Sequence, residues 1–161
     1  MSAREKLKGL VEALDEETAR RILRDWERIV SSHRKVAVIH FDGSARPNPG
    51  EMGIGAVVEC CGKKVEISKK MGFGTNNIAE YLALIEALKV AKKMGARGVE
   101  IYGDSSIVIE QLRGRWKSRD EKLRELKREA LEILSGFDWW KAEWVPESEN
   151  ERAHELANRE V

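Results

Sequence analysis

Four residues of types that bind metal ions or carry protons stand out against their surroundings. Asp42 and Asp104 each end an apolar run, and Glu80 falls on the apolar side of a predicted helix. His154 lies in a helical segment near the end of the chain. Because an unpaired buried carboxylate is costly, Glu80 needs a cation, a hydrogen-bond network or a raised pKa.

The three acids are expected to meet at one edge of a sheet. Asp42 and Asp104 both follow predicted core strands, and open α/β sheets assemble their sites at the carboxyl ends of such strands. Converging carboxylates repel one another, and Mg²⁺ or Mn²⁺ resolves this repulsion by taking oxygen ligands. Two such ions about 4 Å apart can activate a water and stabilise the leaving oxygen in phosphodiester hydrolysis. Taken singly, Asp42 could instead be a turn residue and Asp104 a helix cap.

Length and composition predict one main domain with an appendage. The chain has 161 residues, of which 42% are hydrophobic, which is enough for one well-buried core. The sequence has no apolar stretch long enough for a membrane span, and its first residues do not have the pattern of a signal peptide. We therefore expect a cytosolic protein with no membrane contact. The net charge of +1 does not by itself predict a polyanionic partner.

The first 34 residues are expected to form a hairpin of two amphipathic helices. The second helix carries Ile22, Trp26 and Ile29 on one face. Two short helices with one apolar stripe each need something to pack against, either the main domain, another copy of the chain or another protein. We expect residues 1–34 to be an extension through which the chain can form a homo-oligomer or contact a protein, and residues 35–161 to be the main domain.

The main domain has the pattern of a mixed sheet covered by helices. The predicted elements are, in order, strands at 36–41, 53–60 and 63–70, a helix at 76–94, a strand at 99–102, helices from 105 and at 119–134, a strand at 139–145 and a helix from 149. This order predicts an α/β fold with five strands, the first three an antiparallel meander and the others parallel, and with helices on both faces. Ser148 and Glu151 have the spacing of a capping box at the last helix.

A basic segment lies between two of the predicted helices. Residues 113–128 hold eight Lys or Arg against three acids, and Trp116 lies among them. Such a patch can follow a phosphate backbone, and Arg115, Trp116 and Lys117 are its candidate contacts. The alternative is a solvated helix face with ion pairs along it.

Six short motifs, in the right order and spacing from Lys35 to the C-terminus, resemble ribonuclease H of the type 1 family. They are Phe41-Asp42-Gly43-Ser44, Asn48-Pro49-Gly50, Gly53-Ile54-Gly55, Thr75-Asn76-Asn77-Ile78-Ala79-Glu80, Gly103-Asp104-Ser105 and Asn150-Glu151-Arg152-Ala153-His154-Glu155-Leu156-Ala157. The resemblance implies the ribonuclease H-like fold and an endonuclease that hydrolyses the RNA strand of an RNA/DNA hybrid, leaving 5′-phosphate and 3′-hydroxyl ends. It also implies two Mg²⁺ ions held by a set of four acids.

The matching positions imply roles for the three acids. Asp42 would bridge both ions, and Asp104 would complete the shared site. Glu80 would hold the second ion and order a water near the RNA 2′-hydroxyl.

Four further positions match residues that contact the hybrid. Asn48, Asn76 and Asn77 match residues that reach into its minor groove, where an amide can recognise a 2′-hydroxyl. Thr75 matches a residue that helps to seat a DNA phosphate. As an alternative, Thr75 or Asn76 could cap the helix that follows.

His154 stands where the family has its last aspartate. Imidazole can ligate a divalent ion, but it brings no negative charge and favours softer metals than Mg²⁺. We expect His154 to remain near the first metal as a ligand or proton carrier, and Mn²⁺ to be used relatively better than in relatives with four acids. The alternative is a solvent-facing helix residue. Glu155 is no substitute, because one residue turns a helix by about 100°.

The residues favour an active, metal-dependent ribonuclease H. A different class of function is an RNA/DNA-hybrid-binding or adaptor module on the same fold with a weakened metal site, which only His154 supports. A nuclease of the wider superfamily, such as a resolvase, is disfavoured by the asparagines that can recognise a 2′-hydroxyl.

Overall fold

The computed structural model describes residues 2–11 and 13–159, and it divides the chain into two compact units, Met1–Arg34 and Lys35–Val161. Residues 1, 12, 160 and 161 of the two expected segments lie outside the described residues. In the described ranges, no helix has the length and apolar character that crossing a membrane requires.

The first unit contains two helices, α1 (Ala3–Val11) and α2 (Glu16–Arg34). The Asp15 carboxylate accepts a hydrogen bond from the Thr18 N–H at 2.9 Å, which satisfies one of the free donors at the start of α2. Leu14 and Ile29 are exposed large apolar side chains of this unit. The expected contact of the unit with another chain stays a prediction.

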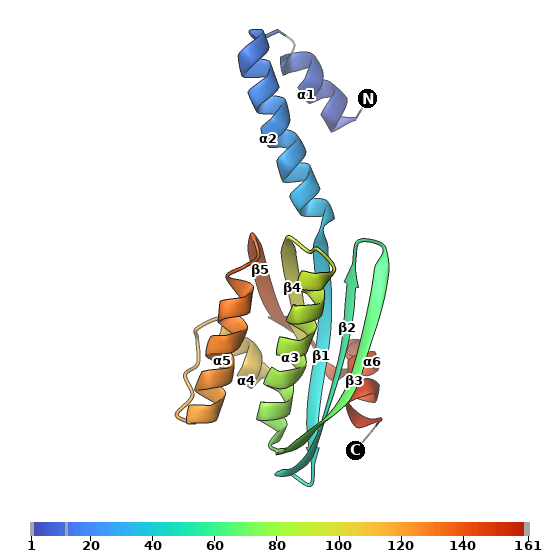
Figure 1. Ribbon diagram of the computed structural model, residues 1–161, viewed down its shortest axis with the longest axis vertical. Coiled ribbons are helices and arrows are strands. Elements are labelled where there is room, and N and C mark those ends of the chain that lie inside the picture. The colour runs from blue at the N-terminus through green and yellow to red at the C-terminus, as the bar shows by residue number, and fades with distance from the viewer. Residues whose placement is uncertain (1, 12, 160–161) are drawn as a thin grey trace. The chain divides into compact units, whose positions relative to one another are not determined.

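The second unit is a five-stranded sheet with helices on both faces (Figure 1). Its elements are β1 (Val36–Arg46), β2 (Gly50–Cys60), β3 (Lys63–Gly74), α3 (Asn76–Lys93), β4 (Gly98–Gly103), α4 (Ser106–Leu112), α5 (Glu121–Leu134), β5 (Trp139–Trp144), the 3-10 turn η1 (Glu147–Glu149) and α6 (Glu151–Asn158). The strand order is β3-β2-β1-β4-β5, with antiparallel pairing among the first three strands and parallel pairing of β4 with β1 and of β5 with β4. The predicted fold class is confirmed.

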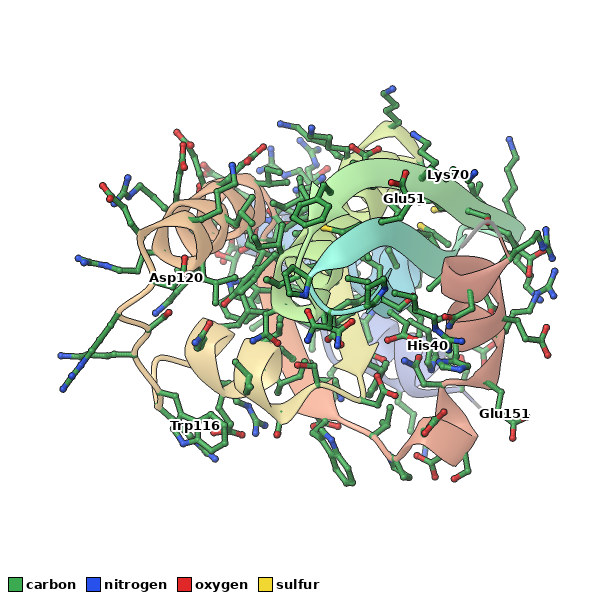
Figure 2. The ribbon with its side chains drawn as sticks, turned by 90° about the horizontal axis from the view of Figure 1, so that it is seen from below. His40, Glu51, Lys70, Trp116, Asp120 and Glu151 are labelled. Carbon is green, nitrogen blue, oxygen red and sulfur yellow. The ribbon has the colours of Figure 1, made fainter. Side chains whose placement is uncertain are left out.

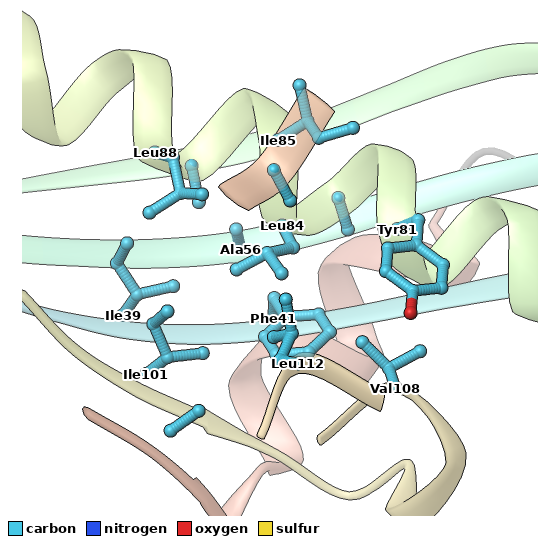
Figure 3. Close-up of a cluster of buried hydrophobic side chains, with 14 of the residues drawn as sticks. Ile39, Phe41, Ala56, Tyr81, Leu84, Ile85, Leu88, Ile101, Val108 and Leu112 are labelled. Carbon is cyan, nitrogen blue, oxygen red and sulfur yellow. The ribbon is translucent and has the colours of Figure 1, made fainter. Parts of the chain in front are cut away.

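The core lies between the sheet and α3. Ile39 and Phe41 of β1 alternate with half-buried residues, as expected of a strand whose two faces are covered unequally. Figure 3 shows Phe41 of β1 close to Leu84 of α3 and Leu112 of α4. The Tyr81 hydroxyl, also buried, donates to the Gln111 side-chain oxygen at 2.6 Å, so this polar pair is satisfied. A well-packed layer thus supports the part of β1 where Asp42 lies.

The first strand is longer than its apolar pattern predicts. The run 36–41 ends at Phe41, but β1 continues to Arg46 because its backbone pairs antiparallel with β2 as far as Arg46↔Glu51. Asp42 is therefore a residue inside a strand and not a turn residue. What ends at Phe41 is the pairing of β1 with β4.

Candidate active site

The end of the β1–β4 pairing brings two acids together. Phe41↔Gly103 is the last parallel pair, and Asp42 and Asp104 are the next residues on the two chains. The Trp144 indole N–H donates to the Asp104 backbone oxygen at 3.1 Å and holds the chain where it leaves β4. Ser105, not Asp104, caps α4, since its hydroxyl accepts from Val108 N–H at 3.3 Å. The Asp104 carboxylate is thus available to the site.

A glycine lets α3 bring Glu80 to the same place. A Cβ on Gly43 would lie 2.3 Å from the backbone carbon of Ala79 and 2.4 Å from the backbone nitrogen of Glu80, so only glycine permits this approach of α3 to β1. Ligand oxygens of Asp42, Glu80 and Asp104 consequently lie within 4.8 Å of one another. The structure brings together the three acids that the sequence analysis selected.

A second glycine lets α6 bring His154 to Asp42 from the other face of the sheet. Gly55 of β2 is paired with Asp42, and a Cβ on it would lie 2.3 Å from both the Ala153 oxygen and the Ala157 nitrogen of α6. The close packing places His154 Nδ1 2.9 Å from Asp42 Oδ2. His154 therefore faces the acids, and the alternative of a histidine turned only to solvent does not hold.

Burial and mutual repulsion change the acidity of two of the acids. Burial, together with the Asp104 charge, raises the pKa of Asp42 to about 6, although contact with His154 acts in the opposite direction. Burial first, then the charge of Asp42, raise the pKa of Glu80 well above its usual value, and the Asp104 charge adds to this, although a hydrogen bond with Ser105 acts in the opposite direction. Both carboxylates hold protons more tightly than free side chains do, as expected of buried acids that lie close to other acids.

One unpaired atom shows what the cluster lacks. Glu80 Oε2 is buried and has no hydrogen-bond partner among the described residues. A buried carboxylate oxygen without a donor is rare, and a cation is the group that would satisfy it together with two neighbouring carboxylates. These residues fit a hard divalent ion. They line a cavity of about 310 Å³ that is open to solvent and that His154 and Asn76 also line.

Asn150 is a site residue that the sequence analysis placed only within a motif. The predicted capping box of Ser148 and Glu151 is wrong, because Ser148 lies within η1 and Asn150 occupies the N-cap position of α6. The Asn150 side chain makes no capping hydrogen bond to the helix. Instead its buried amide donates to the Phe41 backbone oxygen at 2.9 Å and to Asp104 Oδ1 at 3.3 Å. Asn150 thereby ties the start of α6 to both acid-bearing segments. A polar residue before a helix looks like an ordinary cap, so its sequence position could not reveal this inward contact.

Arg46 and Glu147 line the same cavity and were also missed. Arg46 is the exposed last residue of β1 and Glu147 the exposed first residue of η1, and in the sequence one precedes a turn motif and the other lies in an acidic segment, so neither position gave a signal. Each brings a full charge to the edge of the site.

The predicted minor-groove residues gather at the start of α3. The Thr75 hydroxyl caps α3 by accepting from Ile78 N–H at 3.2 Å, and Asn76 Oδ1 accepts from Ala45 N–H at 2.7 Å. Asn48 Oδ1 accepts from Asn76 N–H at 3.1 Å, which joins the turn after β1 to the helix. Asn77 is the second residue of α3 and is half-buried. We call these four residues the rim, and Asn76 among them also lines the cavity of the acids.

The predicted basic contacts lie apart from that cavity, in the connection between α4 and α5. Arg115, Trp116 and Lys117 are exposed there, and Figure 2 shows Trp116 projecting outward from this connection. Arg115 forms an ion pair with Glu110 at 3.6 Å. Lys117 lines a separate surface cavity of about 480 Å³ with three cations of α5, namely Arg124, Lys127 and Arg128. Their shared positive charge suits a polyanion.

Comparisons with known proteins identify the family of this fold and site. A family model described as reverse transcriptase-like matches residues 40–160. Ribonuclease HI of Halobacterium salinarum is 44% identical over 121 residues, which are 74% of this chain and 61% of that protein. The chain belongs to the ribonuclease H family. The crystal structure of RNase H1 from the same archaeon superposes with a TM-score of 0.74 at 43% identity, over 77% of this chain and 96% of that one.

A second solved ribonuclease H is informative because of its ligand. The structure of LC11-RNase H1 in complex with an RNA/DNA hybrid has a TM-score of 0.71 at 34% identity, over 76% of this chain and 94% of that one. The chain spans 61% of the length of the curated Halobacterium relative.

Proposed function

We propose that this protein is an endoribonuclease that hydrolyses the RNA strand of RNA/DNA hybrids with the help of two Mg²⁺ or Mn²⁺ ions. The observation that carries the proposal is the set of three carboxylates within 4.8 Å of one another, one with a buried unpaired oxygen, in a ribonuclease H fold.

The acids have distinct places in this proposal. Asp42 would contribute a ligand to both ions, Asp104 would complete the shared site and Glu80 would hold the second ion. When bound, the ions supply an activated water and stabilisation of the leaving oxygen, which gives 5′-phosphate and 3′-hydroxyl ends. His154, whose Nδ1 lies 2.9 Å from Asp42 Oδ2, would serve the first ion as a ligand or carry a proton there.

The rest of the chain positions these groups and the substrate. Hydrogen bonds from Trp144 and Asn150 fix the segment of Asp104, and Gly43 lets α3 pack closely on β1. The three acids therefore need little rearrangement when substrate binds. The cavity that the acids line is open to solvent, so phosphate and water can reach the acids.

The substrate class follows from the rim and the basic segment. Asn48, Asn76 and Asn77 would read the RNA 2′-hydroxyls in the minor groove, and Thr75 would contact a DNA phosphate. Arg115, Trp116 and Lys117 would contact the backbone farther along the duplex. The hybrid bound by LC11-RNase H1 supports this assignment by homology.

The test is cleavage of end-labelled RNA/DNA, RNA/RNA and DNA/DNA duplexes with Mg²⁺, Mn²⁺ or EDTA, followed by analysis of the product ends. We expect cleavage of only the RNA strand of the hybrid, dependent on either metal, with 5′-phosphate ends. Tight binding of the hybrid without cleavage under any condition would instead identify a hybrid-binding module. Cleavage of DNA/DNA at a similar rate would identify a nuclease without 2′-hydroxyl recognition.

A further inference from the structure

We infer that Glu147 is a positioning residue of the metal site, which acts by orienting the His154 imidazole. The inference rests on the proposed function and deepens it. In this arrangement the Glu147 carboxylate accepts the N–H of His154 Nε2, and the lone pair of Nδ1 is thereby left free for an ion that Asp42 would hold.

Each ring nitrogen of His154 faces one of these two carboxylates. The Asn158 amide also lies 3.5 Å from Nε2, but it donates to the backbone oxygen of His154. Nδ1 lies 2.9 Å from Asp42 Oδ2, and Nε2 lies 3.7 Å from Glu147 Oε1. The Glu147 side chain is 67% exposed, so it can close the remaining gap without disturbing the core. The backbone oxygen of His154 accepts from Asn158 Nδ2 at 2.8 Å, and Asn158 Oδ1 accepts from the Ser44 hydroxyl at 2.9 Å. These bonds tie the last turn of α6 to β1.

The chemistry of a histidine ligand explains why a second carboxylate is needed. A neutral imidazole carries its proton on one nitrogen or the other, and a partner that accepts at Nε2 selects the form in which Nδ1 can bind a metal. An aspartate at position 154 would need no such partner. Glu147 also lines the cavity of the acids, where it restores a negative charge that His154 does not supply.

The neighbouring acid Glu149 provides a matched control. It belongs to the same 3-10 turn and is also exposed, but it lines a different cavity of about 200 Å³ beside His40. Glu147→Gln and Glu149→Gln therefore remove the same charge from the same turn, and only the first replaces a carboxylate that faces His154 by a weaker, neutral acceptor.

The experiment measures Mn²⁺ affinity by isothermal titration calorimetry, and kcat on an RNA/DNA hybrid, for both variants. It repeats Glu147→Gln in a His154→Asp background. We expect Glu147→Gln to weaken Mn²⁺ binding and to lower kcat about tenfold, the low end for a residue that orients a metal ligand. Glu149→Gln should change either quantity less than about twofold, and Glu147→Gln should have little effect once His154 is replaced.

Three outcomes would overturn the inference. They are a Glu147→Gln variant like the wild type, an equal loss in Glu149→Gln, and an undiminished effect of Glu147→Gln in the His154→Asp background. A wild-type protein that binds Mn²⁺ but cleaves no hybrid would refute the proposed function alone, because the Mn²⁺ affinities still decide the role of Glu147.

Discussion

Replacing Gly43 by alanine should separate Glu80 from the other acids. The added Cβ would lie 2.3 Å from the Ala79 carbon and 2.4 Å from the Glu80 nitrogen, whereas ordinary contacts begin at 3.4 Å. Both neighbours are backbone atoms of the first turns of α3, so they cannot rotate away. The helix, and Glu80 with it, must therefore retreat from β1 by about 1 Å.

Such a shift has two measurable effects. Overpacking of this kind costs about 1–3 kcal/mol, and the two backbone contacts place Gly43→Ala at the upper end. In a protein of this size the loss lowers Tm by about 6–12 °C. A displacement of about 1 Å at a catalytic group lowers kcat by about a hundredfold. Urea unfolding and hybrid cleavage well below Tm measure the two effects separately.

Gly74→Ala is the matched control in the same sheet. Its Cβ would also be crowded, at 2.5 Å from Met52 Sδ, but the end of a methionine side chain can move. We expect this variant to keep kcat within about twofold and to lose at most about 1 kcal/mol. If Gly43→Ala behaved in the same way, the packing of α3 on β1 would not be what positions Glu80.

Three further predictions concern protons, metals and salt. Because the folded pKa of Asp42 is raised to about 6 and that of Glu80 is raised as well, protonation stabilises the metal-free fold below about pH 4. This contribution, on the order of 3 kcal/mol for Asp42, is lost as the pH rises through 6, and urea unfolding in EDTA at a series of pH values will show it. His154→Asp should shift the ratio of Mg²⁺-supported to Mn²⁺-supported rates toward Mg²⁺, measured as kcat with each metal. Replacing both Arg115 and Lys117 by glutamate should weaken hybrid binding and flatten its dependence on salt, measured by fluorescence anisotropy from low to high ionic strength.

Each of these three predictions has a contradicting result. Saturating Mg²⁺ should remove the fall in stability near pH 6. If Mg²⁺ left the dependence of stability on pH unchanged, groups other than Asp42 and Glu80 would be its cause. An equal ratio of Mg²⁺-supported to Mn²⁺-supported rates in the wild type and in His154→Asp would mean that the imidazole does not contact the metal ion. An unaltered salt slope after the charge reversal would show that the connection between α4 and α5 does not contact the duplex.

The sequence could predict the acids because each broke a local pattern. Glu80 interrupts the apolar side of a helix, and Asp42 and Asp104 follow apolar runs, so each conflicted with its surroundings in a way that tertiary structure had to resolve. The strand order followed for a similar reason, since a meander and then alternating helices allow few topologies.

What the sequence could not show depends on contacts between distant segments. The extension of β1 to Arg46 comes from pairing with β2, not from its own residues. The inward turn of Asn150 depends on a carbonyl of β1 and on the carboxylate of Asp104, which follows β4. The approach of Glu147 to His154 depends on how α6 packs on Gly55. Local propensity has no information about such partners.

The most direct test of the metal site compares the wild type with Asp42→Asn in one assay of RNA/DNA hybrid cleavage with Mg²⁺. Asparagine keeps the shape of the side chain but removes the charge that would bridge two ions. We predict that the wild type cleaves the RNA strand and that the variant binds the hybrid and has the wild-type fold but does not cleave it. Cleavage by Asp42→Asn at the wild-type rate would contradict the assignment of this cluster as the active site.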